Sequence, residues 1–189
     1  MTARRVAAPR WLSPIAARAA SSAAGLHEAA FRELYAHTAG RLLGFLICRT
    51  GGDRSAAEDL LQETYYRLLR APDLPCDLEG RTRLAFRIAI NLARDRDRRE
   101  RVRERPLPPS PTAGTGCARA CAAELGDALA ALHPRERDLL WLAYVEGASH
   151  REIAAIAGVR EASVRPILYR ARRKIAALLR PARPERSEP

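Results

Sequence analysis

The chain has 189 residues, enough for one domain or two small ones. Its net charge of +11 indicates an anionic partner, and nucleic acid is the first candidate. No run of 18 apolar residues occurs, so we expect no membrane-spanning segment.

The two ends of the chain and its cysteines carry little structural information. Residues 1–25 hold four arginines and no acidic residue, without the apolar segment of a secretory signal, so we expect a disordered basic arm. We expect residues 181–189 to be a disordered tail. The four cysteines are scattered, which favours reduced thiols in a cytoplasmic protein. Cys117 and Cys121 are four residues apart without a second Cys/His pair nearby, so we expect neither a metal site nor a cofactor.

Two helices are predicted first, within a domain spanning residues 26–105. Leu26–Thr50 has a broad apolar face, and Gly51 and Gly52 end it. Asp53 or Ser55 can cap the next helix, at about Ala56–Arg70. Seven of its residues share a predicted inner face: Ala57, Leu60, Leu61, Thr64, Tyr65, Leu68 and Leu69.

A polar stripe lies opposite that inner face and consists of Asp59, Gln62, Glu63 and Tyr66. Such stripes are usually ordinary solvated surface. In a basic protein, a largely acidic stripe is also consistent with a docking surface for a basic or polar partner. The sequence pattern alone leaves both interpretations open.

A loop is predicted over Pro72–Gly80 and a third helix over about Arg81–Glu104, with Leu84, Ile88 and Leu92 facing inward. Its far end mixes arginines with acids, as in a solvated helix with internal salt bridges. Asn91 lies between apolar turns, where an amide can bond a base edge or a backbone carbonyl.

Residues 106–120 are predicted to be a flexible linker, because four prolines and two glycines precede Cys117. A second helical domain follows over residues 121–180. We expect a short helix at Leu125–Leu132 and another from Pro134 to Val145, whose core is Leu139, Leu140, Leu142 and Val145. The fold class is therefore all-α, with two small helical domains.

A helix-turn-helix is predicted over residues 149–174. Ser149 and Glu152 have capping-box spacing, and Gly158 can supply the left-handed backbone of a tight turn. Val164 falls where the second helix packs back on the first. From Arg160 to Arg180 there are seven basic residues and one acid. A helix with one apolar stripe and a basic remainder suits the phosphate-lined major groove, although a solvated cationic helix shows the same pattern.

Several separate motifs, in order, resemble those of bacterial extracytoplasmic-function sigma factors, a branch of the sigma-70 family. They are FRELY at Phe31, AEDLLQETYYRLLR from Ala57 and RIAINLARDRDRR from Arg87, followed by ALHPRERDLLWLAYVEGASHREIAAIAGV and SVRPILYRARRKI. The resemblance covers about residues 31–175. It implies a non-enzymatic protein that binds core RNA polymerase and directs initiation at promoter DNA, and it leaves an anti-sigma factor open as a further partner.

The resemblance also implies residue roles. The polymerase contact maps to Asp59, Gln62, Glu63 and Tyr66. Recognition of the −10 promoter element maps to the Pro72–Gly80 loop and to Arg87, Asn91, Arg94 and Arg98. Recognition of the −35 element maps to Arg160, Ser163, Arg165, Tyr169 and Arg170.

The chain departs from the family pattern twice. Leu84 stands where a tryptophan is common, and Pro166 stands where a recognition helix usually has a small polar residue. Two rival functions are a sigma-like adaptor that sequesters an anti-sigma factor and a stand-alone helix-turn-helix regulator. The basic recognition helix disfavours the first and the polar stripe disfavours the second. No catalytic residue is predicted, because the carboxylates lack a histidine or cysteine partner at useful spacing.

Overall fold

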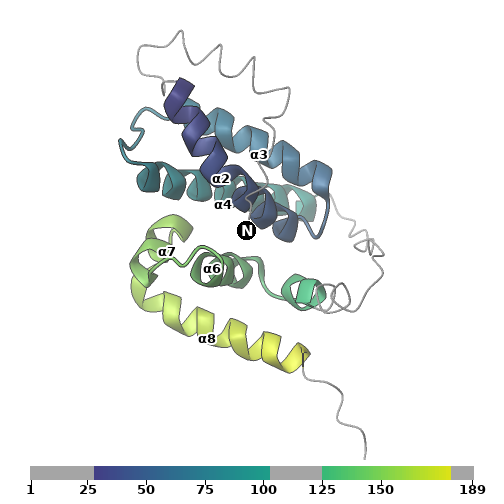
Figure 1. Ribbon diagram of the computed structural model, residues 1–189. Coiled ribbons are helices and arrows are strands. Elements are labelled where there is room, and N and C mark those ends of the chain that lie inside the picture. Colours follow the sequence, from purple (N-terminus) through teal and green to yellow (C-terminus); the bar gives the residue numbers. More distant parts are fainter. Residues whose placement is uncertain (1–27, 103–124, 180–189) are drawn as a thin grey trace, which may run out of the picture. The chain divides into compact units, whose positions relative to one another are not determined.

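The computed structural model describes residues 28–102 and 125–179, and every ordered element in these two ranges is helical (Figure 1). Contacts divide the chain into two compact units between residues 104 and 105. The predicted arm, linker and tail lie outside the described residues, as do Cys117 and Cys121.

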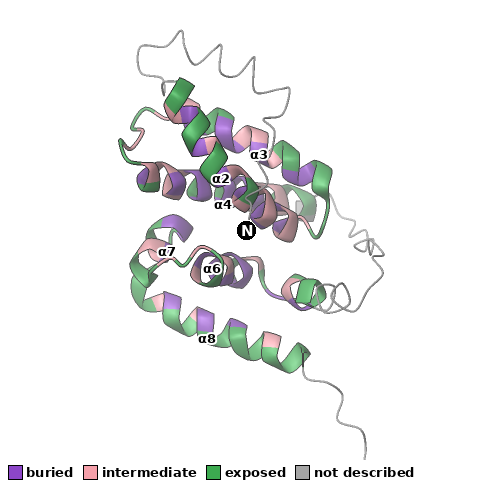
Figure 2. Ribbon diagram, in the orientation of Figure 1, coloured by how far each residue is buried: buried purple, intermediate pink, exposed green. Residues whose placement is uncertain are grey.

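The first unit packs three helices around one core: α2 (Glu28–Arg49), α3 (Arg54–Leu69) and α4 (Leu78–Val102). Asp53 begins α3 by accepting a hydrogen bond from the Ala56 N–H at 3.0 Å, so it is the cap, and Ser55 is already helical. In the core, Phe31 meets Tyr65 edge-on with ring centroids 5.8 Å apart. The Tyr65 hydroxyl pairs with Thr38 at 2.7 Å, so its polar atom is satisfied although the residue is fully buried. Figure 2 shows buried residues on each of the three helices.

Helix α4 begins at Leu78, three residues before the predicted start. The Asp77 carboxylate caps it by accepting a hydrogen bond from the Gly80 N–H at 2.7 Å, and this bond lowers the pKa of Asp77. Gly80 is buried against Pro75, and an added Cβ would come within 2.6 Å of the Pro75 Cβ. The Pro72–Gly80 loop therefore ends sooner than predicted and is fixed against the first turn of α4.

The inner face of α4 is rotated from the predicted one. Leu84 and Ile88 are only half-buried, whereas the fully or nearly fully buried positions are Ala85, Phe86, Ala89, Ile90 and Ala93, with Leu92 at their edge. Three alanines allow α4 to approach α2 and α3 closely. The predicted inner face of α4 was based on the large aliphatic side chains alone. It is therefore about one residue out of register with the observed face.

A partly buried ion pair connects the end of α2 to α4. The Arg49 guanidinium donates to the Asp97 carboxylate at 2.7 Å, and only 2% of the Arg49 side chain is exposed. The pair lies at the level where α4 becomes rich in arginine. It therefore fixes the orientation of the basic half of that helix.

The second unit contains a helical stretch at 125–130 and three further helices: α6 (Pro134–Tyr144), α7 (His150–Ala157) and α8 (Glu161–Leu178). Buried Arg137 donates to the carbonyls of Leu129 and Ala130, both at 2.8 Å, and so satisfies the end of the 125–130 stretch. Leu139, Leu140 and Leu142 are buried as predicted. Val145 is not a core residue: it caps the end of α6, where it is 56% exposed.

Helix α8 continues through Pro166. Proline has no N–H, so the carbonyl four residues earlier, that of Ala162, loses its helical donor. Ala162 is exposed, and water can replace that donor. Pro166 therefore weakens the first turn of α8 without ending the helix.

Candidate nucleic-acid and protein interfaces

The polar stripe predicted on α3 faces outward. Asp59 and Tyr66 are exposed, and Gln62 and Glu63 are half-buried, while Leu61, Thr64, Tyr65 and Leu68 on the opposite face are buried. Glu63 accepts from Arg67 Nε at 2.7 Å. The Arg70 guanidinium lies over the Tyr66 ring, 5.1 Å from its centroid. The stripe is thus an accessible surface that carries both carboxylates and a cation-covered aromatic ring.

A groove of about 420 Å³ runs between this stripe and α4. Asp59 and Glu63 form one wall, Arg96 and Arg99 are on the other, and Leu60 is among the apolar lining residues. For the second wall, the sequence pattern predicted only a solvated helix end. The sequence nevertheless contains the pattern that predicts this wall. One helical face, distinct from the face predicted to contact DNA, carries Leu92, Asp95, Arg96 and Arg99.

The four residues predicted to contact the −10 element share one face of α4, since their spacings of four, three and four residues follow the helical repeat. Arg87, Asn91 and Arg98 are exposed, and Arg98 is paired with Asp95 at 3.2 Å. Arg94 is half-buried, so it is less accessible than the other three. The structure therefore places all four predicted residues on one face of α4, and Arg94 is the least exposed of them.

The helix-turn-helix has the predicted local geometry. The Ser149 and Glu152 side chains each accept a hydrogen bond from the other's backbone N–H, at 3.3 and 2.9 Å respectively. Gly158 has φ +65°, in the left-handed region that favours glycine. Val164 of α8 is fully buried where α8 packs on α7. Two helices are thereby held at a tight turn with little freedom to change their angle.

An ion pair holds α8 on α6. Lys174 Nζ lies 3.0 and 2.8 Å from the two carboxylate oxygens of Glu136, which is buried. Glu136 also accepts from the His133 N–H at 3.2 Å. Burial opposes ionisation of this carboxyl, but Lys174 and the His133 N–H outweigh it and lower the pKa of Glu136 below its ordinary value.

This pair should make the second unit sensitive to acid. A carboxyl whose pKa is lower in the folded state contributes stability above its unfolded pKa, and that contribution is lost as the pH falls through the folded pKa. We expect Glu136→Gln to lower urea stability at pH 7 but to change it much less at pH 3. Urea titrations followed by circular dichroism at both pH values measure this, and equal destabilisation at both would contradict it.

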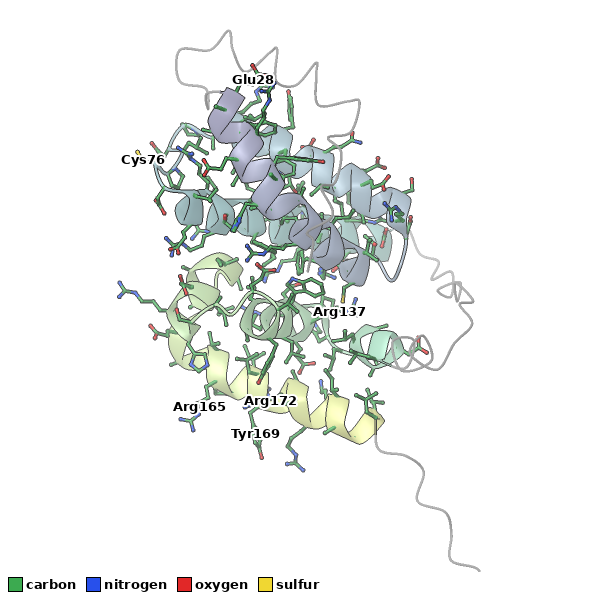
Figure 3. All side chains as sticks on the ribbon, in the orientation of Figure 1. Glu28, Cys76, Arg137, Arg165, Tyr169 and Arg172 are labelled. Atoms are coloured by element: carbon green, nitrogen blue, oxygen red, sulfur yellow. The ribbon has the colours of Figure 1, made fainter. Side chains whose placement is uncertain are left out.

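Most residues predicted to read the −35 element project from α8 into solvent. Arg160, Arg165, Tyr169 and Arg170 are exposed, and Figure 3 shows Arg165 and Tyr169 extending away from the helix. Ser163 is half-buried. The Arg173 guanidinium lies 6.0 Å from the Tyr169 ring centroid, a contact that sequence analysis did not include.

Comparison with known proteins identifies the family. Over 159 residues the chain is 35% identical to the RNA polymerase sigma factor CarQ of Myxococcus xanthus, an alignment that covers 79% of this chain and 89% of that protein. The chain belongs to the extracytoplasmic-function sigma factors of the sigma-70 family. Residues 122–175 of this sigma factor match the family model for sigma-70 region 4, which contains the whole helix-turn-helix.

Solved structures share the fold of this chain. The sigma factor RpoE, crystallised with the anti-sigma factor NepR from Bartonella quintana, matches with a TM-score of 0.59 over 81% of this chain and 98% of RpoE. At 21% identity that match concerns the fold. CnrH, solved with the cytosolic domain of CnrY, is 27% identical with a TM-score of 0.58 over 88% of this chain and 95% of CnrH. Within the described ranges, no helix of the sigma factor is long and apolar enough to cross a membrane.

Proposed function

We propose that this sigma factor binds core RNA polymerase through the α3 stripe and places the two DNA-contacting faces of α4 and α8 on the −10 and −35 elements. The polymerase supplies the chemistry, in the cytoplasm. The arrangement of α7, the Gly158 turn and α8 carries the proposal, because it presents an exposed basic helix that buries Val164, Leu168 and Ala171 in packing.

The polarity of each surface fits its proposed partner. The α3 stripe is acidic within a basic protein, which suits a basic segment of another protein better than it suits DNA. The outer faces of α4 and α8 are rich in arginine, whose planar guanidinium matches both phosphate and guanine edges. Asn91 adds an exposed amide that can recognise a base edge or an unstacked base.

Run-off transcription with purified core polymerase tests the proposal. Genomic fragments serve as templates, and sequencing of the transcript 5′ ends reveals the sequences shared upstream. We expect transcripts that require the sigma factor and that share −10 and −35 motifs. A folded protein that binds polymerase but adds no transcripts would contradict the proposal and favour the adaptor, whereas DNA binding without polymerase binding would favour the regulator.

Arg165→Ala should weaken promoter binding while polymerase binding is retained. Arg165 is exposed early in α8, beside the buried Val164. If it reads a base, its loss should cost about 1–3 kcal/mol and relax preference at one position of the −35 element. Competition binding with single-base variants of the element measures this. Unchanged binding to the −35 element would remove Arg165 from the interface.

An anti-sigma factor is a further proposed partner. The support is that RpoE was crystallised with the anti-sigma factor NepR and has the same fold as this chain. Such a partner would control access to the α3 stripe or to the α8 surface, and either would prevent assembly on a promoter.

A further inference from the structure

Lys174 is the only lysine among the 33 basic residues of the chain, and all the others are arginines. A guanidinium stays protonated in proteins, whereas an amine can lose its proton and react as a nucleophile. This single lysine also has a defined structural place, because its Nζ lies 3.0 and 2.8 Å from the two carboxylate oxygens of Glu136. The only amine side chain of the protein is therefore located where α8 is held on α6.

The amine of this pair can be reached from solvent although its partner is shielded. The Lys174 side chain is 54% exposed, and the Glu136 side chain is 11% exposed. A reagent in solution can approach Nζ from its outer side while the carboxylate stays on its inner side. Lys174 thus differs from a buried lysine, which a reagent does not reach, and from a fully solvated lysine, whose modification changes little in the fold.

The groups around Nζ suit a reaction with an acyl phosphate. Glu136 lies 2.8 Å from Nζ and can accept the proton that an amine must lose before it attacks a carbonyl carbon. Because the pKa of Glu136 is low, this carboxylate holds the proton only briefly and passes it to water. Exposed Arg170 lies four residues before Lys174, on the same side of α8. Its guanidinium can bind the phosphate group of the donor beside the amine.

We propose that Lys174 is an acylation site that accepts an acetyl group from an acyl phosphate, and that this modification loosens α8 from α6. The deprotonated Nζ attacks the acyl carbon, a C–N bond forms, and the C–O bond to the phosphate breaks. Inorganic phosphate leaves, and the proton of the amine passes through Glu136 to water. The product is a neutral amide in place of a cation.

Acylation leaves the buried carboxylate of Glu136 without its cation. The amide N–H can still donate one hydrogen bond, but the positive charge that lowers the pKa of Glu136 is lost. A buried carboxylate is costly to keep ionised without a cation, so the contact between α6 and α8 weakens. Since α8 has the predicted −35 contacts, DNA binding should weaken as well. That last consequence rests on the proposed function, whereas the chemical step and the loss of stability do not.

Treatment of the full-length protein with acetyl phosphate tests the chemical step. Mass spectrometry of proteolytic peptides detects acetyl-lysine, which can arise only at Lys174. We expect Lys174 to react at least about tenfold faster in the unaltered protein than in Glu136→Gln, because a positioned proton acceptor typically contributes a factor of about 100 or more. Both proteins are kept at a temperature where circular dichroism shows them folded. If Glu136 only shielded the amine, the Glu136→Gln protein would react faster instead.

Unfolding of the second unit tests the structural consequence. We expect acetylation to lower the urea midpoint of this unit and to weaken binding to the −35 duplex found by run-off transcription about tenfold, as for a lost charge-assisted hydrogen bond. Lys174→Gln should lower the midpoint similarly without treatment. Lys174→Arg is the matched control, because it keeps the charge and a guanidinium is not acylated. Acetyl phosphate should leave the midpoint of this variant unchanged, which excludes effects of acetylation at the N-terminal amine.

Either of two results would overturn the proposal. The first is a lack of acetyl-lysine, or equal or faster reaction of folded Glu136→Gln, which would make Lys174 an ordinary exposed amine. The second is an unchanged urea midpoint in the acetylated protein, which would show that the charge of Lys174 does not hold α8 in place. A lowered midpoint with unchanged DNA affinity would support the acylation site and count against the proposed DNA-binding role of α8.

Discussion

Reversal of Asp59 and Glu63 to lysine is expected to abolish competition for core RNA polymerase while the helical fold is retained. Asp59 is exposed, and Glu63 is paired with exposed Arg67, so the change loses an ion pair worth about half a kcal/mol or less. At an interface with a basic partner the same reversal juxtaposes like charges, which costs several kcal/mol. The expected loss of polymerase affinity is therefore at least about a hundredfold.

The first unit offers a closely matched control in Glu33→Lys/Glu58→Lys. Both glutamates are exposed, and Glu58 pairs with Arg54 at 2.8 Å in the same four-residue spacing as Glu63 with Arg67. The control makes the same change in net charge and breaks the same kind of helix-surface pair. It should compete for polymerase like the unaltered protein. If the Asp59 and Glu63 variant competes equally well while folded, the stripe is ordinary solvated surface.

Local sequence patterns predicted the features that depend only on residues close together in the chain, such as helix faces, caps and turns. On α3 the apolar and polar residues recur at helical spacing on opposite faces, so the stripe could be located before the structure was known. The capping box at Ser149 and the left-handed Gly158 depend on a few neighbouring atoms, and both are confirmed. These features need no knowledge of what lies across the core.

The features that sequence analysis missed depend on contacts between distant segments. The alanine face of α4 is buried because neighbouring helices approach it, which side-chain size alone does not reveal. Val145 follows the apolar pattern of α6 but comes after the last helical residue, Tyr144, and so has no core to enter. The Tyr144–Arg172 hydrogen bond joins positions 28 apart, and the Arg49–Asp97 ion pair joins positions 48 apart. A local sequence pattern therefore predicts neither of them.

Removing the Asp97 carboxylate should be the most destabilising of the changes considered. Asp97→Ala removes a carboxylate that pairs with the buried Arg49 guanidinium. Breaking a fully buried pair in this way typically costs about 3–5 kcal/mol, and because 25% of the Asp97 side chain is exposed we expect about 3 kcal/mol, the lower end of that range. This is a large part of the roughly 5–15 kcal/mol by which a domain is stable. Because Asp97 lies on the arginine-rich half of α4, the proposed binding of this helix to the −10 element should also weaken.

Urea unfolding of the full chain measures the effect, with separate transitions for the two units allowed in the analysis. Asp95→Ala is the control, because its pair with Arg98 at 3.2 Å lies at the surface and should cost about half a kcal/mol or less. Arg49→Met/Asp97→Ala replaces the cation with an apolar side chain of similar length and should recover most of the loss. If Asp97→Ala were no worse than Asp95→Ala, the buried pair would not be what holds α2 and α4 together, and packing of Phe45 on Phe86, whose centroids are 5.9 Å apart, would have to do so.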